Sequence, residues 1–108
     1  ADSQGLPTVV FDEIDTGVSG EVADRVGSLM ARMARERQVL AITHLPQIAS
    51  KADTHLLVSK AEQDNQVRTN IRAVIAEDRV QALAHMLSGR KLTPAALENA
   101  RVLLAARR

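Results

Sequence analysis

The sequence predicts an α/β fold with a mainly parallel sheet, a hairpin at the edge of that sheet, and two C-terminal helices. Two continuous apolar runs, residues 8–12 and 39–43, flank a stretch with helical periodicity, which is the pattern of a β-α-β unit. Two later runs alternate apolar and polar residues around a polar turn, as hairpin strands do. The first apolar run is typical of a strand that is buried on both faces of its sheet.

Composition limits the class of protein. A chain of 108 residues suffices for one domain with a modest core, and 45% hydrophobic with 25% charged residues is typical of globular proteins. The formal net charge of +1 produces no strong field, so charge alone does not indicate nucleic-acid binding. The absence of cysteine excludes disulfides and thiolate metal sites. Nothing at the start resembles a signal segment, so we expect a cytoplasmic location.

The first half of the chain reads as two strands and two helices in alternation. We expect a strand at residues 8–12, a helix at about 21–37, a strand at 39–43, and a short helix at 45–52 that starts near Pro46. The long helix is amphipathic, because its apolar residues recur at helical spacing. These apolar residues are Val22, Val26, Leu29, Met30 and Met33.

The second half begins with the hairpin, whose strands we place at residues 55–60 and 67–75 around a turn at 62–66. Two helices follow. Asp78 can cap the first helix and Gly89 ends it, whereas Thr93 and Pro94 open the second helix. Their apolar faces carry Val80, Leu83 and Leu87 in the first helix, and Leu97, Ala100 and Leu104 in the second.

Polar side chains follow the two parallel strands at their ends. Asp12 and Glu13 end the first strand, and Thr43 and His44 end the second. Parallel strands joined by a crossover helix finish at the same sheet edge, where open α/β sheets bind ligands. Two carboxylates and an imidazole there suit phosphate chemistry, with one carboxylate for hydrated magnesium and another to take a proton from water. The alternative is that Asp12 and Glu13 only end a strand and His44 only caps a helix.

Several motifs together resemble one protein family. The "VVFDE" of residues 9–13 resembles the Walker B element of ABC-type ATPases, residues 15–20 occupy the place of their D-loop, and residues 42–44 that of their switch histidine. The longer stretches "FDEIDTGVSG", "THLPQIA" and "HLLVSK" are similar to the RecN family of bacterial DNA repair proteins, which are relatives of the SMC proteins. The stretches "LAHMLSG" and "TPAALENARVLL" extend this resemblance over nearly the whole chain.

The resemblance implies a P-loop NTPase-like, three-layer fold of the ABC/SMC head type, with ATP and Mg²⁺ as cofactors. By position in the motifs, Asp12 would hold Mg²⁺ through water. Glu13 would polarise the attacking water, and His44 would contact the γ-phosphate. Asp12 and His44 therefore count as cofactor-binding residues, and Glu13 and His44 as catalytic residues.

The D-loop of the family reaches across a head-to-head homodimer toward the partner's nucleotide. At the matching positions here stand Gly17, Val18 and Ser19. Ser19 departs from the wider ABC pattern, in which transporters and SMC proteins usually have Asp, so its cross-dimer contact stays open.

The sequence contains no G-x-x-x-x-G-K-[ST] loop to bind phosphates. The "LSGR" of residues 87–90 imitates the ABC signature, but it ends a predicted helix, and that end has the wrong polarity for a phosphate. We therefore interpret residues 1–108 as the C-terminal lobe of a head, to be completed by the N-terminal lobe of the same protein. The strand of the phosphate loop is absent, so strand 39–43 should keep an unpaired edge and should not pair with strand 55–60.

The function implied is ATP hydrolysis by a DNA double-strand-break repair protein that acts on DNA at the bacterial nucleoid, with no membrane partner. Two alternatives are the matching lobe of another ABC or SMC ATPase, such as a transporter subunit, and a non-catalytic interaction module. "THLPQIA" favours the RecN family over the first alternative, and Glu13 argues against the second. Some residues remain open: Gln47 could touch nucleotide or cap a helix, and several arginines could meet phosphates or only face solvent. These arginines are Arg32, Arg35, Arg37, Arg107 and Arg108.

Overall fold

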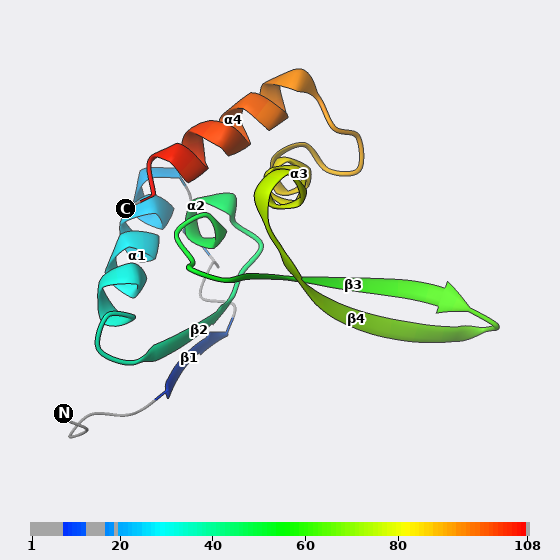
Figure 1. The fold of residues 1–108 in the computed structure, drawn as a ribbon, viewed down its shortest axis with the longest axis horizontal. Coiled ribbons are helices and arrows are strands. Elements are labelled where there is room, and N and C mark those ends of the chain that lie inside the picture. The colour runs from blue at the N-terminus through cyan, green and yellow to red at the C-terminus, as the bar shows by residue number, and fades with distance from the viewer. Residues whose placement is uncertain (1–7, 13–16, 19, 108) are drawn as a thin grey trace.

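The computed structural model describes residues 8–12, 17–18 and 20–107. Figure 1 shows a parallel strand pair beside a group of helices, with a long hairpin extending away from them. The elements are β1 (Thr8–Asp12), α1 (Gly20–Met33), β2 (Gln38–Ile42), α2 (Pro46–Ala49), β3 (His55–Gln63), β4 (Gln66–Val74), α3 (Ala76–Ser88) and α4 (Pro94–Ala105). The predicted α/β fold and its order of elements are confirmed.

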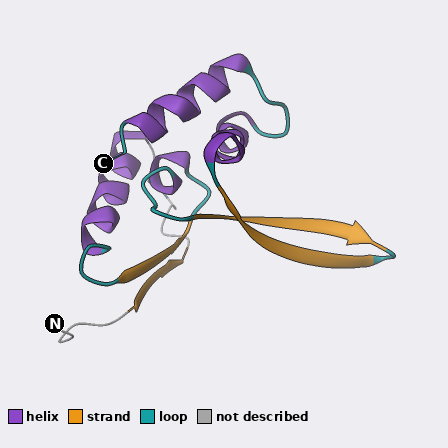
Figure 2. Cartoon of the chain, in the orientation of Figure 1, coloured by secondary structure: helices purple, strands orange, loops and turns teal. Residues whose placement is uncertain are grey.

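The strands form two separate sheets, which Figure 2 shows in one colour. β1 pairs in parallel with β2, and β3 pairs antiparallel with β4. The hairpin is therefore confirmed, but its predicted place at the edge of the parallel sheet is wrong for this chain. The described residues supply no strand that could bridge β2 and β3, and β2 keeps one edge without a described partner, as predicted.

The parallel pair is covered on one face only. Phe11 and Val39 pack against the helices, whereas Val10 is 58%, Leu40 44% and Ile42 55% exposed. Successive side chains in a strand point to opposite faces, so the exposed residues share the uncovered face. The expectation that the first strand is buried on both faces is wrong for this chain, because no described element covers that second face.

The inward face of α1 matches the predicted one only in part, because Met30 and Val26 pack inward as predicted. Its buried residues are Ala23, Gly27 and Met30, and Val22 and Leu29 are more than half exposed. The helix also ends at Met33, earlier than predicted, and the next residues form a turn. The apolar stripe of α1 is thus wider than the surface that this chain offers to cover it.

Gly27 allows α1 and α2 to lie close together. An added Cβ at Gly27 would lie 2.9 Å from Cγ of Lys51 and 3.0 Å from the carbonyl oxygen of Gln47. The second atom belongs to the backbone of α2 and cannot move without moving that helix. Packing of Gly27 on a helix, instead of on the sheet, is a contact that the sequence pattern does not show.

Gly27→Ala is therefore expected to destabilise the fold, although alanine is the better helix former. Overpacking costs about 1–3 kcal/mol, and the gain in helix propensity offsets up to about 1 kcal/mol of this cost. The measurement is the free energy of unfolding in urea, with Ser28→Ala on the same helix as the matched control. An unfolding free energy of Gly27→Ala equal to or above the parent value would contradict the close contact.

α3 and α4 form the main core. Leu83 is completely buried there with Ala84, Ala96 and Ala100. The Thr93 hydroxyl caps α4, because it accepts a hydrogen bond of 3.0 Å from the backbone N–H of the third helical residue. The helix-opening role predicted for Thr93 is confirmed.

The predicted N-cap of α3 is wrong. α3 begins at Ala76 after the extended residue Ile75, and no side chain caps it. Asp78 lies inside the first turn, where a negative charge is still favoured by the helix dipole. Gly89 ends the helix with φ +79°, which confirms the predicted stop.

The hairpin turn is tighter than predicted. Asp64 and Asn65 both have positive φ, 53° and 62°, and together they form the two-residue connection between β3 and β4. Asp and Asn tolerate this left-handed conformation better than most residues. The strands are correspondingly longer, and Val58 and Ile71 face each other across them with more than half of their surface exposed.

Candidate functional site

The parallel register brings two predicted site residues to one edge. Asp12 is the last residue of β1 and lies opposite Ile42, the last residue of β2. Thr43 and His44 follow directly, so His44 leaves the sheet at the edge where β1 ends. The predicted convergence of Asp12 and His44 is confirmed, and both are exposed.

Thr43 shapes the turn that presents His44. Its Oγ1 accepts a hydrogen bond of 3.0 Å from the backbone N–H of Leu45, and α2 starts one residue later at Pro46. Proline suits the first helical position because it has no N–H to leave unpaired there. His44 is therefore held between a strand end and a helix start. The sequence signal was a threonine two residues before a leucine-proline pair.

Of the three D-loop candidates, Ser19 lies outside the described residues, and so does the predicted catalytic residue Glu13. Gly17 is exposed, and its φ of +75° is a backbone conformation that favours glycine. Val18 is partly buried and packs against the cluster of Ala23, Met30 and Ile48. Val18 therefore contributes to the apolar core beneath α1.

The donor set at the edge fits one kind of metal. Among the described residues, no group of three or more His, Asp or Glu side chains could hold a metal alone. Mg²⁺ keeps several water ligands and often uses only one or two carboxylates together with substrate phosphates. The exposed carboxylate of Asp12 at the end of a strand therefore suits magnesium.

Three further polar side chains, His55, His85 and Gln47, lie in structural surroundings. The pKa of His55 is lowered from its ordinary value, mainly because the ring is partly buried and secondly because the positive Arg79 guanidinium is near. His85 Nδ1 lies 2.8 Å from the carbonyl oxygen of Gly89, the residue that follows the last residue of α3. The "LSGR" of residues 87–90, which imitates the ABC signature, therefore lies at a helix C-terminus. The side-chain oxygen of Gln47 is buried, and no described group donates a hydrogen bond to it.

Three curated proteins are similar to this chain over most of its length. DNA repair protein RecN of Rickettsia conorii is 41% identical over 103 residues, which are 95% of this chain and 19% of that protein. The RecN of Halalkalibacterium halodurans is 45% identical over 101 residues, which are 94% of this chain and 18% of that protein. The RecN of Haemophilus influenzae is 40% identical over 104 residues, which are 96% of this chain and 19% of that protein. The chain thus spans about a fifth of these relatives. No protein-family model matches it.

A solved structure shares the fold. It comes from work on ATP-driven dimerization and DNA-stimulated activation of SMC ATPases, and its TM-score is 0.63 over 82% of this chain and 52% of that chain. The sequence identity is 19%, so this likeness concerns the fold alone. It confirms the predicted head-type architecture. In the described part of this chain, no helix is both long and apolar enough to cross a membrane.

Proposed function

The chain belongs to the RecN family, of whose members it spans 18–19%, and from this premise we propose that it is the C-terminal lobe of an ATPase head that acts in DNA repair. The observation that carries the proposal is the convergence of Asp12 and His44 at the carboxyl edge of a parallel strand pair. Ligands of open α/β sheets bind at such an edge.

Each edge residue has a distinct role in hydrolysis. Asp12 would hold hydrated Mg²⁺, which bridges phosphate oxygens and neutralises their charge when it is bound. Glu13, the next residue, would accept a proton from the attacking water, and His44 would donate a hydrogen bond to the terminal phosphate. Gly17, in its glycine-favoured conformation, would let the D-loop approach a second head.

The remaining parts must come from another segment. This chain has no phosphate loop, and one apolar face of its parallel pair is uncovered, as is the apolar side of the hairpin. Exposed apolar surface of this kind marks an interaction site. We assign it to the N-terminal lobe of the same protein, which in the family carries the phosphate loop. Two complete heads would then engage as a homodimer whose ATP cycle acts on DNA in the bacterial cytoplasm.

The experiment that tests the proposal compares the chain alone with the chain plus its N-terminal lobe. Alone, it is expected neither to bind ATP tightly nor to hydrolyse it, because carboxylates without phosphate-binding amides and a lysine repel the nucleotide. Co-expression with the N-terminal lobe should produce magnesium-dependent hydrolysis.

Two outcomes would contradict this. Hydrolysis by the chain alone, well above that of its Glu13→Gln variant, would show that the site needs no second lobe. A stable complex of the two lobes that binds ATP without hydrolysing it would instead favour a non-catalytic interaction module.

A further inference from the structure

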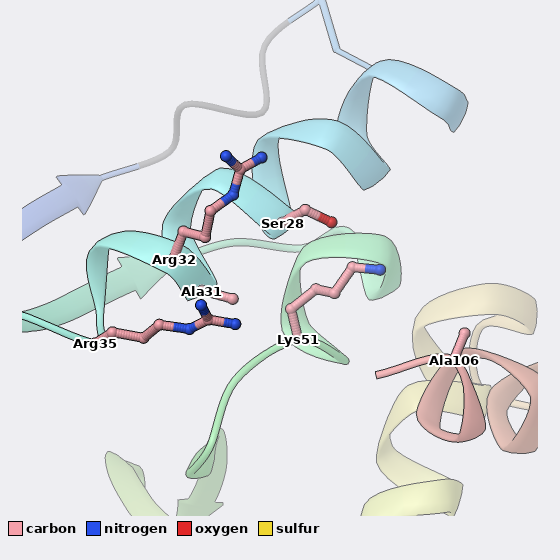
Figure 3. Close-up of a pocket in the computed structure, with 6 residues that line it drawn as sticks. All are labelled: Ser28, Ala31, Arg32, Arg35, Lys51 and Ala106. Atoms are coloured by element: carbon pink, nitrogen blue, oxygen red, sulfur yellow. The ribbon is translucent and has the colours of Figure 1, made fainter. Parts of the chain in front are cut away.

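A basic cavity lies where the end of α1 meets the ends of α2 and α4. Its volume is about 210 Å³. Figure 3 shows Arg32 and Arg35 on the α1 side and Lys51 on the α2 side. The residues that line it are Ser28, Ala31, Arg32, Arg35, Lys51 and Ala106.

Two of the three cations in this cavity are not neutralised. Lys51 Nζ lies 2.7 Å from an oxygen of Asp24, so this lysine has its own counter-charge. Among the described residues, no carboxylate lies within ion-pair distance of Arg32 or Arg35. Within the described part of the chain, the cavity therefore has two arginines without an ion-pair partner.

Arg32 lies in the last turn of α1, where its charge is favoured by the dipole of that helix, but neither Arg32 nor Arg35 is needed to cap α2. Cations commonly stabilise the carbonyl ends of helices, and α2 ends beside this cavity. The α2 end is already served by two other arginines. Arg79 donates to the carbonyl oxygens of Ala49, Ser50 and Ala52, at 2.7 Å for the last, and Arg107 Nε donates to Ala52 at 2.9 Å.

The cavity is also separate from the proposed hydrolysis site. α1 begins beside the carboxyl edge of the parallel pair, where Asp12 lies, and runs for 14 residues to the opposite edge, where β2 begins. A helix of that length spans about 21 Å. The cavity residues of α1 lie in its last turns and just beyond, at the far end of the helix from Asp12.

We propose that this cavity binds phosphate groups of a DNA backbone. The planar guanidinium fork matches the geometry of a phosphate, and the Ser28 hydroxyl adds a neutral donor on the cavity wall. The chain has one aromatic residue, Phe11, which packs in the core, so it offers no platform for stacking bases. Contacts of this kind position DNA without reading its sequence. The inference rests on the proposed function, which supplies DNA as the polyanion.

The test uses the complete RecN-type protein and a fluorescent 40-base-pair duplex, with affinity measured by anisotropy over a salt series. Arg32→Gln with Arg35→Gln should weaken binding about tenfold or more near 0.1 M salt and make the slope of log K against log salt shallower by about 2. The double lysine variant, Arg32→Lys with Arg35→Lys, should restore most of the slope because it keeps the charge.

The matched control removes the same charge elsewhere. Arg25 and Arg101 are exposed and paired with Glu21 and Glu77, so Arg25→Gln with Arg101→Gln leaves the cavity intact. This control should bind DNA nearly as the parent does. ATP hydrolysis without DNA should be unchanged in the double glutamine variant.

Three results would overturn the inference. They are parental DNA binding by the double glutamine variant, an equal loss in the control, and a loss of DNA-independent hydrolysis, which would assign Arg32 and Arg35 to the nucleotide site or to folding. If the parent itself binds no DNA, the proposed function fails and this inference fails with it.

Discussion

Replacing Glu13 by Gln in the complete protein is expected to lower ATP hydrolysis by roughly 10² to 10⁴, the usual contribution of a general base. Glutamine keeps the size and the hydrogen-bonding capacity of the side chain, but it cannot accept a proton from water. Nucleotide binding should survive, because the proposed magnesium ligand Asp12 and the proposed phosphate-binding lobe are unchanged. If hydrolysis releases the engaged heads of the proposed homodimer, the variant should accumulate as an ATP-bound dimer.

Asp12→Ala provides the contrast. It removes the carboxylate that would hold Mg²⁺, so ATP-dependent dimerization and hydrolysis should weaken together. A sizing column with ATP, combined with a phosphate-release assay, separates the two variants. Parental hydrolysis by Glu13→Gln, or loss of its nucleotide binding, would show that Glu13 is not the base.

The second large effect concerns stability. Leu83→Ala is expected to lower the free energy of unfolding by about 2–5 kcal/mol, because Leu83 is completely buried between α3 and α4 and its removal leaves a cavity. The neighbouring alanines have short side chains and cannot fill that space. Urea unfolding of the head assembled from both lobes measures the loss.

Leu87 gives a control on the same helix. It was predicted to share the apolar face with Leu83, but it is 36% exposed. Leu87→Ala should therefore cost clearly less than Leu83→Ala under the same conditions. Equal losses for the two variants would mean that the α3–α4 core is not packed as described.

Local sequence patterns predicted most of the helices and strands. The continuous run of β1, the proline that starts α2, and the Thr93 cap each depend on neighbours within a few residues, and the structure has each of them where the sequence predicted. Hairpin strands were also predicted, but the two-residue turn at Asp64 and Asn65 was not. Either residue also fits a longer polar loop, and their positive φ angles are set by the tight pairing of the strands.

Burial was harder to predict, because it depends on surfaces that one helix or strand cannot specify. Val22 and Leu29 follow the helical period as well as Met30 does, but of these three only Met30 is buried by described neighbours. The uncovered side of Val10 and Leu40 has the same cause. Apolar residues mark every surface that a complete head would bury, including surfaces that no described element of this chain covers.

The sequence predicted where Asp12 and His44 lie in the candidate site, but it did not predict every feature that the structure shows. Asp12 and His44 follow from the rule that parallel strands end together, which needs only the order of elements. Glu13 and Ser19 lie outside the described residues, so their roles stay predictions. Arg32 and Arg35 were among the arginines that could meet phosphates, but their cavity with Lys51 could not be predicted, because it depends on the packing of α1 on α2 at Gly27.

The parallel pair also has a consequence for the order of folding. Its partner residues, such as Thr8 and Gln38, lie 30 positions apart, whereas α3 and α4 are joined by a short loop within one continuous stretch. Contacts between distant residues form slowly, because the entropy of closing a long loop opposes them until the strands meet. The helical end of the chain can therefore condense early, while the edge that bears Asp12 is assembled late. A newly made lobe would acquire its packed core before it acquires the geometry for chemistry.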